Sequence, residues 1–233
     1  MPKKILILIV SDNNMECIKN AVMELDNVDY ADLLIVDDGS DYNIMSLLGK
    51  HKKVKCIRHE FEQGYGACID TALNYARDME YDYFITLDCE TRNITNDIPE
   101  IVKNLDYGYD IVSCSRILEN YNYEKIDKDI LSFYETIAAP FNEETGLDFT
   151  DPLSGNKGFN VQATEHIVLT EVTHGIHIQL LIQGVFYGCS IIEIPSDSCL
   201  EPGKEINERD NLLDYFIALI TTEKFLFNKG TIN

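Results

Sequence analysis

The alternation of short apolar runs with segments of helical periodicity constrains the fold of this chain more than any other feature. Short runs rich in β-branched residues are typical of buried strands, and strands that alternate with helices are typical of a mostly parallel sheet flanked by helices. We therefore expect a single α/β domain. The predicted strands are residues 4–10, 33–36, 54–57, 83–87, 110–113 and 190–194, and the predicted helices are residues 15–24, 42–50, 66–79, 98–105, 130–139, 163–169 and 177–187.

One further helix is predicted at the C-terminal end, over residues 211–227. Its apolar side chains are too many to form one narrow stripe along the helix, so other protein surface must bury them. We expect a domain over residues 1–210 and an apolar helix within residues 211–233 that packs on the domain or at an interface, such as that of a homodimer. Contact with a membrane surface is the less favoured alternative.

The charge of the chain excludes one class of partner and constrains another. Its 40 Asp and Glu residues outnumber 19 Lys and Arg residues, and the formal net charge of -21 repels a nucleic-acid backbone. A bound diphosphate would need a cation between its oxygens and the acidic side chains. We therefore expect no nucleic-acid partner and, for any nucleotide ligand, a divalent metal.

The sequence contains no segment that predicts a membrane anchor. No run approaches the roughly 20 apolar residues of a membrane span, and the N-terminal apolar run lacks the cleavage site of a signal peptide. The seven cysteines form no CxxC pair and have no histidine at metal-ligand spacing, which is typical of reduced thiols. We predict a cytoplasmic protein, with peripheral use of a membrane left open.

Polar residues follow the first two predicted strands where each strand ends. Ser11 and Asn13 follow the first strand, and Asp37 and Asp38 follow the second, directly before Gly39. Ligands of parallel sheets bind beyond these carboxyl ends, where carboxylates can accept hydrogen bonds from a nucleobase or ribose. Asp, Gly and Ser are also common in ordinary turns, so both interpretations stay open.

Two more strand ends carry candidate binding residues. Gly64 and Gly66 lead into a helix, where a close backbone approach and the helix N-terminus favour an anion, although a glycine turn that merely starts the helix is the commoner case. Asp88 and Glu90 lie one residue apart, so in an extended segment both carboxylates point to one side and suit Mg²⁺ or Mn²⁺. The alternative is a solvated strand end.

The order of these motifs resembles a known family. VDDGS, QGYGAC, ITLDCE, SCSR, TDPLSGNKGF and a late EIP strand occur in the order and approximate spacing of family-2 glycosyltransferases of the GT-A fold. The nearest resemblance is to dolichyl-phosphate and polyprenyl-phosphate sugar transferases, over about residues 4–204. The resemblance implies a Rossmann-like sheet, a UDP- or GDP-linked sugar as donor, Mg²⁺ or Mn²⁺ as cofactor, and inversion at the anomeric carbon.

The resemblance also implies roles for individual residues. Asp88 and Glu90 match the metal-binding DxD motif as a DxE variant, Arg116 would lie near a donor or acceptor phosphate, and Asp151 falls on the acceptor side. The residues implied to bind the nucleotide sugar are Ser11, Asn13, Asp37, Asp38, Gly64, Gly66, Asp88 and Arg116.

The acceptor is the least constrained part of this prediction. A hydroxyl acceptor needs a general base, for which Asp151 is the candidate, whereas a phosphate acceptor needs none. A turn cap before Pro152 is an equally good explanation of Asp151, and a surface ion pair is an alternative for Arg116. The acceptor is left as a polyprenyl phosphate or a soluble hydroxyl.

Several positions depart from the family pattern and leave other functions open. Asn14 and Gln179 replace acidic residues, and Leu200 stands where the family has an arginine, for which Lys204 and Arg209 could compensate. A non-catalytic sugar-nucleotide-binding or regulatory protein on the same scaffold is therefore the alternative function. A nucleotidyltransferase is disfavoured because no Gly-rich loop follows the first strand.

Two histidines near the C-terminal end form a further candidate site. His174 and His177 lie three residues apart, which on a helix would place both imidazoles on one face, as a further metal ligand or a proton shuttle. Gly175 between them indicates a helix boundary, and this is the favoured interpretation.

Overall fold

The computed structural model describes residues 2–48, 54–89, 95–118, 128–196 and 209–228. The described strands form one seven-stranded sheet in the order β3-β2-β1-β4-β6-β5-β7. β6 runs antiparallel to its neighbours β4 and β5, and the other neighbouring pairs are parallel. The strands are β1 (Ile5–Ser11), β2 (Ala31–Asp37), β3 (Val54–Arg58), β4 (Tyr83–Thr86), β5 (Ile111–Ser115), β6 (Lys157–Asn160) and β7 (Ile191–Pro195).

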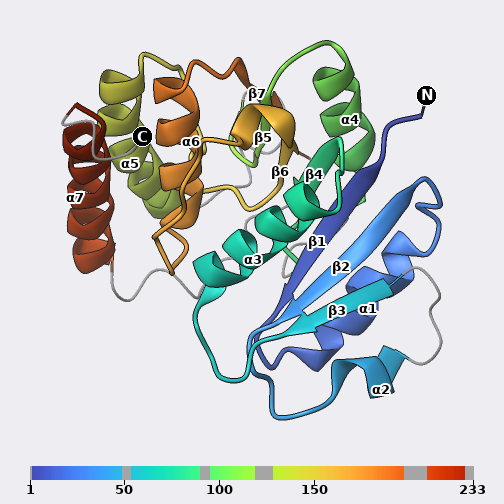
Figure 1. The fold of residues 1–233 in the computed structure, drawn as a ribbon. Coiled ribbons are helices and arrows are strands. Elements are labelled where there is room, and N and C mark those ends of the chain that lie inside the picture. Colours follow the sequence, from blue (N-terminus) through green and yellow to red (C-terminus); the bar gives the residue numbers. More distant parts are fainter. Residues whose placement is uncertain (1, 49–53, 90–94, 119–127, 197–208, 229–233) are drawn as a thin grey trace.

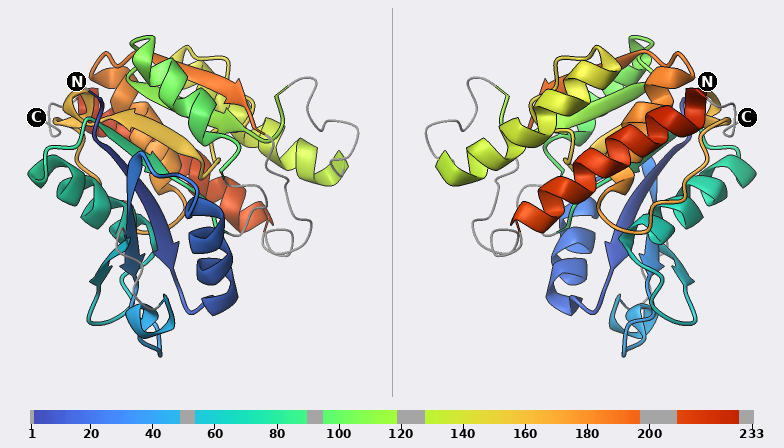
Figure 2. Two further views of the ribbon diagram at one scale, coloured as in Figure 1. Left: turned by 90° about the vertical axis from the view of Figure 1, so that its right-hand side faces the viewer. Right: turned by 90° about the vertical axis from the view of Figure 1, so that its left-hand side faces the viewer.

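Helices cover both faces of this sheet (Figures 1 and 2). α1 and α4 pack on one face, and α3 and α6 pack on the other. The expected single α/β domain with a mostly parallel, helix-flanked sheet is therefore confirmed. The helices are α1 (Met15–Leu25), α2 (Ile44–Leu48), α3 (Tyr65–Asp78), α4 (Ile98–Asp106), α5 (Lys128–Thr145), α6 (Ile176–Phe186) and α7 (Arg209–Asn228).

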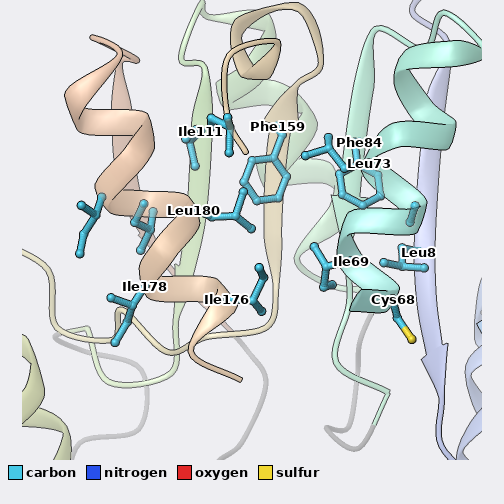
Figure 3. Close-up of a cluster of buried hydrophobic side chains, with 14 of the residues drawn as sticks. Leu8, Cys68, Ile69, Leu73, Phe84, Ile111, Phe159, Ile176, Ile178 and Leu180 are labelled. Carbon is cyan, nitrogen blue, oxygen red and sulfur yellow. The ribbon is translucent and has the colours of Figure 1, made fainter. Parts of the chain in front are cut away.

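The interior strand β1 illustrates why its sequence is apolar up to its last residue, Ser11. Successive side chains of a strand point to opposite faces. Leu6 and Leu8 belong to the core on the α3 side, whereas Ile7 and Ile9 belong to the core on the α1 side. Figure 3 shows Leu8 near the α3 side chains, among them Cys68. Both faces of β1 are buried, so its polar residues begin only at the strand end, with Ser11.

The C-terminal helix α7 packs against α5 and α6, and its side chains join the core on the α3 side (Figure 2). Glu223 of α7 is only 2% exposed. Its carboxylate accepts hydrogen bonds from Gln179 Nε2 at 2.6 Å and Gln183 Nε2 at 3.0 Å, both on α6. Because a buried carboxylate without partners is costly, these two bonds fix how α7 docks on α6. A contact between two copies of the chain through this helix stays a prediction.

Two predictions about elements are wrong. The helix expected over residues 163–169 is a single 3-10 turn over Gln162–Thr164. The backbone N–H groups that would continue it donate instead to side chains of α6: Val168 N to Gln183 Oε1, and Thr170 N to Gln179 Oε1. Strand β6 was not expected, because it is short and contains a glycine within a turn-rich segment.

The described helices include none with the length and apolar character needed to cross a bilayer.

Candidate functional site

A cavity of about 520 Å³ opens beyond the carboxyl ends of β1, β2 and β4. Its lining residues fall into two groups. Four carboxylates, Asp12, Asp38, Glu62 and Asp88, come from the strand ends and the loop before α3. The other group contains Arg116, His174 and His177, beside apolar side chains from α5 and α7 that include Phe133, Leu212 and Phe216. The cavity is therefore lined by both acidic and basic side chains, together with apolar ones.

Asp88 is held in place by the turn that precedes β6. Its backbone N–H donates to Asn156 Oδ1 at 2.8 Å, and Asn156 Nδ2 donates to buried Asp97 Oδ2 at 2.8 Å. Thr86, two residues earlier, donates to the Gly155 carbonyl at 2.7 Å. These bonds give Gly155 and Asn156, in the segment TDPLSGNKGF, a structural role in positioning the end of β4. Glu90, the second predicted metal ligand, lies outside the described residues, so the paired ligand set stays a prediction.

Ser11, Asn13 and Asp37 connect the first two strand ends, and none of the three lines the cavity. Asn13, with a left-handed φ of 70°, donates its backbone N–H to Ser40 Oγ at 3.2 Å, and Ser11 Oγ lies 3.5 Å from the same oxygen. Asp37 Oδ1 accepts the Ser40 backbone N–H at 3.0 Å. Asp37 Oδ2 is buried without a hydrogen-bond partner among the described residues, although Arg58 Nη1 is 3.3 Å away. Arg58 thus supplies a charged neighbour for this oxygen, and the contact of Asp37 with a nucleotide stays a prediction.

Asp38 holds the loop before α3. Its carboxylate accepts hydrogen bonds from His59 Nδ1 at 2.7 Å, Gln63 N at 2.9 Å and Gly64 N at 2.8 Å. Burial opposes ionisation, but these donors outweigh it and lower the pKa of Asp38. Asp38 lines the cavity with oxygens that are already engaged. The structure therefore gives it a loop-anchoring role in addition to the predicted contact with the nucleotide.

His59 was not identified from the sequence, and it forms a buried cluster with Asp38 and Cys68. One ligand atom of each residue lies within 4.8 Å of the others, which is a spacing that a metal ion could use. Both ring nitrogens of His59 are engaged, however, since Nε2 lies 3.0 Å from Thr71 Oγ1. Burial also raises the pKa of the Cys68 thiol. We interpret the cluster as a hydrogen-bonded support for the loop.

Gly64 and Gly66 both make room for the backbone of the segment before α6. Gly64, at φ 100°, lines the cavity, but Gly66 does not. A Cβ on Gly66 would lie 2.1 Å from the Glu171 carbonyl oxygen, and its N–H donates to the Val172 carbonyl at 2.8 Å. Tyr65 between them stacks on His174 with ring centroids 4.6 Å apart. The QGYG turn thus fixes the segment before α6 against the start of α3.

Replacing Gly66 by alanine is expected to lower the free energy of unfolding by about 2–3 kcal/mol, because the added methyl group displaces the Glu171 backbone. At an ordinary helical position this change stabilises a protein by up to about 1 kcal/mol. Urea unfolding of the variant measures the difference, with exposed Asn74→Ala on the same helix as the control. A gain in stability for Gly66→Ala would contradict the close contact.

Arg116 and Asp151 form a buried ion pair. Arg116 Nε and Nη2 donate to the two carboxylate oxygens of Asp151 at 2.7 and 2.9 Å, and the Arg116 backbone N–H adds a bond of 3.2 Å. Burial alone would lower the pKa of Arg116, but the charge of Asp151 outweighs it and raises the pKa well above its ordinary value. Arg116 is therefore charged where it lines the cavity.

The position of Asp151 bears on its predicted role as a base. It is 0% exposed, does not line the cavity and has both oxygens on Arg116, which is itself 8% exposed. The surface ion pair considered for Arg116 is wrong because both partners are buried. This geometry favours a positioning role for Asp151, and the general-base role stays a prediction.

His174 and His177 both line the cavity, although they do not share a regular helical face. Gly175 caps α6, which begins at Ile176, so the helix boundary favoured from the sequence is confirmed. His177 lies 5.4 Å from the ring of Tyr65, measured between centroids. Tertiary packing against Tyr65, rather than helical spacing, brings the two imidazoles to the cavity.

Comparison with known proteins agrees with this geometry. Residues 8–167, more than half of the chain, match the family described as Glycosyl transferase family 2. The chain belongs to glycosyl transferase family 2. The family predicted from the ordered motifs is therefore confirmed, and with it the assignment of the chain as an enzyme of the glycosyltransferase class.

Two relatives of this family-2 glycosyltransferase are sugar transferases that act with dolichyl or dolichol phosphate. The UDP-N-acetylglucosamine–dolichyl-phosphate N-acetylglucosaminyltransferase of Methanococcus voltae is 31% identical over 117 residues, 43% of this chain and 47% of the relative. The dolichol-phosphate mannosyltransferase of Pyrococcus furiosus is 23% identical over 204 residues, 82% of this chain and 55% of the relative. The chain thus spans about half the length of these two relatives.

Solved structures with the same fold include glucosyl-3-phosphoglycerate synthase of Mycobacterium tuberculosis in complex with Mn²⁺, UDP and phosphoglyceric acid. The two structures superpose with a TM-score of 0.72 at 15% sequence identity, over 95% of this chain and 78% of the synthase. The expected GT-A fold is confirmed.

Proposed function

We propose that this family-2 enzyme is a metal-dependent, inverting glycosyltransferase that moves a sugar from a nucleoside diphosphate to an acceptor bound in the same cavity. The observation that carries the proposal is that strand-end carboxylates line the same cavity as Arg116 and two histidines. A donor with its metal fits the first group, and an anionic acceptor fits the second.

The carboxylates that line the cavity suit a divalent metal with its diphosphate. Asp12, Glu62 and Asp88 offer hard oxygen donors, and in a chain with a net charge of -21 a diphosphate would be repelled without a cation. Asp88, with Glu90, would hold Mg²⁺ or Mn²⁺. When bound, the metal supplies charge neutralisation for the departing nucleoside diphosphate.

The nucleoside would lie against the ends of β1 and β2. Asp37 Oδ2, which has no hydrogen-bond partner among the described residues, would accept an N–H of the base, and Ser11 and Asn13 would lie beside it. UDP is bound by the glucosyl-3-phosphoglycerate synthase of the same fold, which supports a uracil base. GDP is the alternative.

Among acceptor classes, a phosphate is supported best by the basic residues of the cavity, Arg116, His174 and His177. A phosphate oxygen is already anionic and needs no deprotonation, which agrees with the engagement of Asp151 by Arg116. The charged Arg116 guanidinium would orient this oxygen toward the anomeric carbon, on the side opposite the leaving diphosphate. Dolichyl phosphate in the named relatives supports this acceptor class, and a soluble hydroxyl compound is the alternative.

The test is calorimetric titration of the protein with UDP and GDP, with and without Mn²⁺, followed by NMR analysis of the product formed from the matching nucleotide sugar. We expect metal-dependent binding of one nucleotide and a product whose anomeric configuration is opposite to that of the donor. Absence of nucleotide binding under every condition would exclude the transferase function. Tight binding without transfer would favour the sugar-nucleotide-binding alternative.

A further inference from the structure

The structure contains two buried histidines near the cavity, and they differ in how their ring nitrogens are used. His59 has a partner for each nitrogen, Asp38 and Thr71. His177 is 2% exposed, and its Nδ1 has no hydrogen-bond partner in the part of the chain that the structure describes. A buried polar atom without a partner destabilises a fold by about 1–3 kcal/mol, so it calls for a physical explanation.

The remainder of α6 shows that its buried polar groups are otherwise satisfied. Gln179 binds Thr170, Glu171 and Glu223, and Gln183 binds Val168 and Glu223. Only two residues before Gln179, His177 is oriented to the cavity instead. The missing partner of its imidazole is therefore expected to be a molecule that enters the cavity.

The charges around His177 indicate what kind of molecule this is. Burial lowers the pKa of His177 well below its ordinary value, and Lys157, His174 and Arg116 lower it further. The imidazole is thus neutral at pH 7 and keeps one N–H to donate. All three of these neighbours are basic groups, in a protein that is strongly acidic as a whole. An imidazole N–H beside the Arg116 guanidinium suits an anionic oxygen better than a metal cation.

We propose that His177 binds an anionic oxygen of the acceptor, in the form of a phosphomonoester, by donating an imidazole N–H beside Arg116. This inference rests on the proposed function, since it names a residue that would bind the proposed acceptor in the same cavity. It adds a ligand-contacting residue that lies beyond the part of the chain matched by the family, which ends at residue 167. Tyr65, stacked on His174, connects this contact to the start of α3.

The experiment compares wild type, His177→Leu and His177→Asn in calorimetric titrations with two phosphomonoesters, glycerol 3-phosphate and geranyl phosphate, at saturating UDP and Mn²⁺. Glycerol and geraniol are the matched uncharged ligands. Leucine removes the N–H at similar volume, whereas the asparagine amide can restore a donor. His166→Asn is the control, because His166 is an exposed histidine outside the cavity.

We expect His177→Leu to raise the Kd of a phosphomonoester roughly tenfold or more, with partial recovery in His177→Asn and an unchanged Kd for UDP with Mn²⁺. A response to glycerol 3-phosphate alone would identify a soluble acceptor, and a response to geranyl phosphate alone would identify a lipid acceptor. Either response supports the inference.

Three other outcomes would overturn it. If wild type binds neither phosphomonoester, the anion site is absent. If wild type and His177→Leu bind a phosphomonoester with equal affinity, His177 has only a structural role. Weaker binding of UDP with Mn²⁺, at unchanged phosphomonoester affinity, would place His177 on the donor side. Failure of wild type to bind UDP at all is a separate result, which contradicts the proposed function and is measured before any phosphomonoester is added.

Discussion

Replacing Asp151 by alanine is expected to lower the free energy of unfolding by about 3–5 kcal/mol, because it leaves the buried Arg116 guanidinium without its counter-charge. For a chain of this length such a loss corresponds to a fall in Tm of roughly 10 °C or more. Thermal and urea unfolding measure both quantities. Asp148→Ala, which removes an exposed carboxylate three residues earlier, serves as the control and is expected to have little effect.

A double variant separates the ion pair from its surroundings. Arg116→Met combined with Asp151→Leu replaces both charges by apolar groups of similar size, and such replacements recover most of the stability lost when one partner is removed. A further variant, Asp151→Asn, distinguishes the two roles considered for Asp151. If Asp151 were a general base with no structural role, Asp151→Asn would keep wild-type stability and lose only turnover with hydroxyl acceptors.

The second large effect is expected at Asp88. Asp88→Asn should weaken Mn²⁺-dependent binding of UDP by at least about 100-fold, since metal coordination contributes several kcal/mol to charge stabilisation in such sites. The fold should be retained, because the backbone N–H of this residue still donates to Asn156. Calorimetry at several Mn²⁺ concentrations measures the loss, and Asp78→Asn at the exposed end of α3 is the control. Unchanged metal dependence would show that Asp88 is not a ligand.

The sequence predicted those parts of the site that depend on strand ends. Asp38, Gly64, Asp88 and Arg116 line one cavity, as expected for residues at or near the carboxyl ends of neighbouring strands. These positions follow from periodicity, because a run of apolar residues must end where the chain leaves the sheet. The order of the motifs then identified the family.

Contacts between distant segments could not be predicted in the same way. His59 pairs with Asp38 across 21 residues, and Tyr65 stacks on His174 across more than a hundred. Gly66 had the signature of an anion-binding turn, yet its missing side chain makes room for the Glu171 carbonyl. The helix predicted over residues 163–169 does not form, because backbone N–H groups that would continue it donate to the glutamine side chains of α6. Each case depends on which surfaces meet, which local sequence does not encode.

Helix α7 has a consequence for how such an enzyme can diversify. Its residues Leu212 and Phe216 form part of the cavity wall, while its docking on α6 depends on Glu223, two to three helical turns further along. Wall and anchor are therefore separate on the same helix. Substitutions at Leu212, which is only partly buried, can therefore change the cavity wall without altering the Glu223 bonds or the carboxylates at the strand ends. If the acceptor binds as proposed, the C-terminal helix is the element through which the size of the acceptor site can change while the strand ends stay the same.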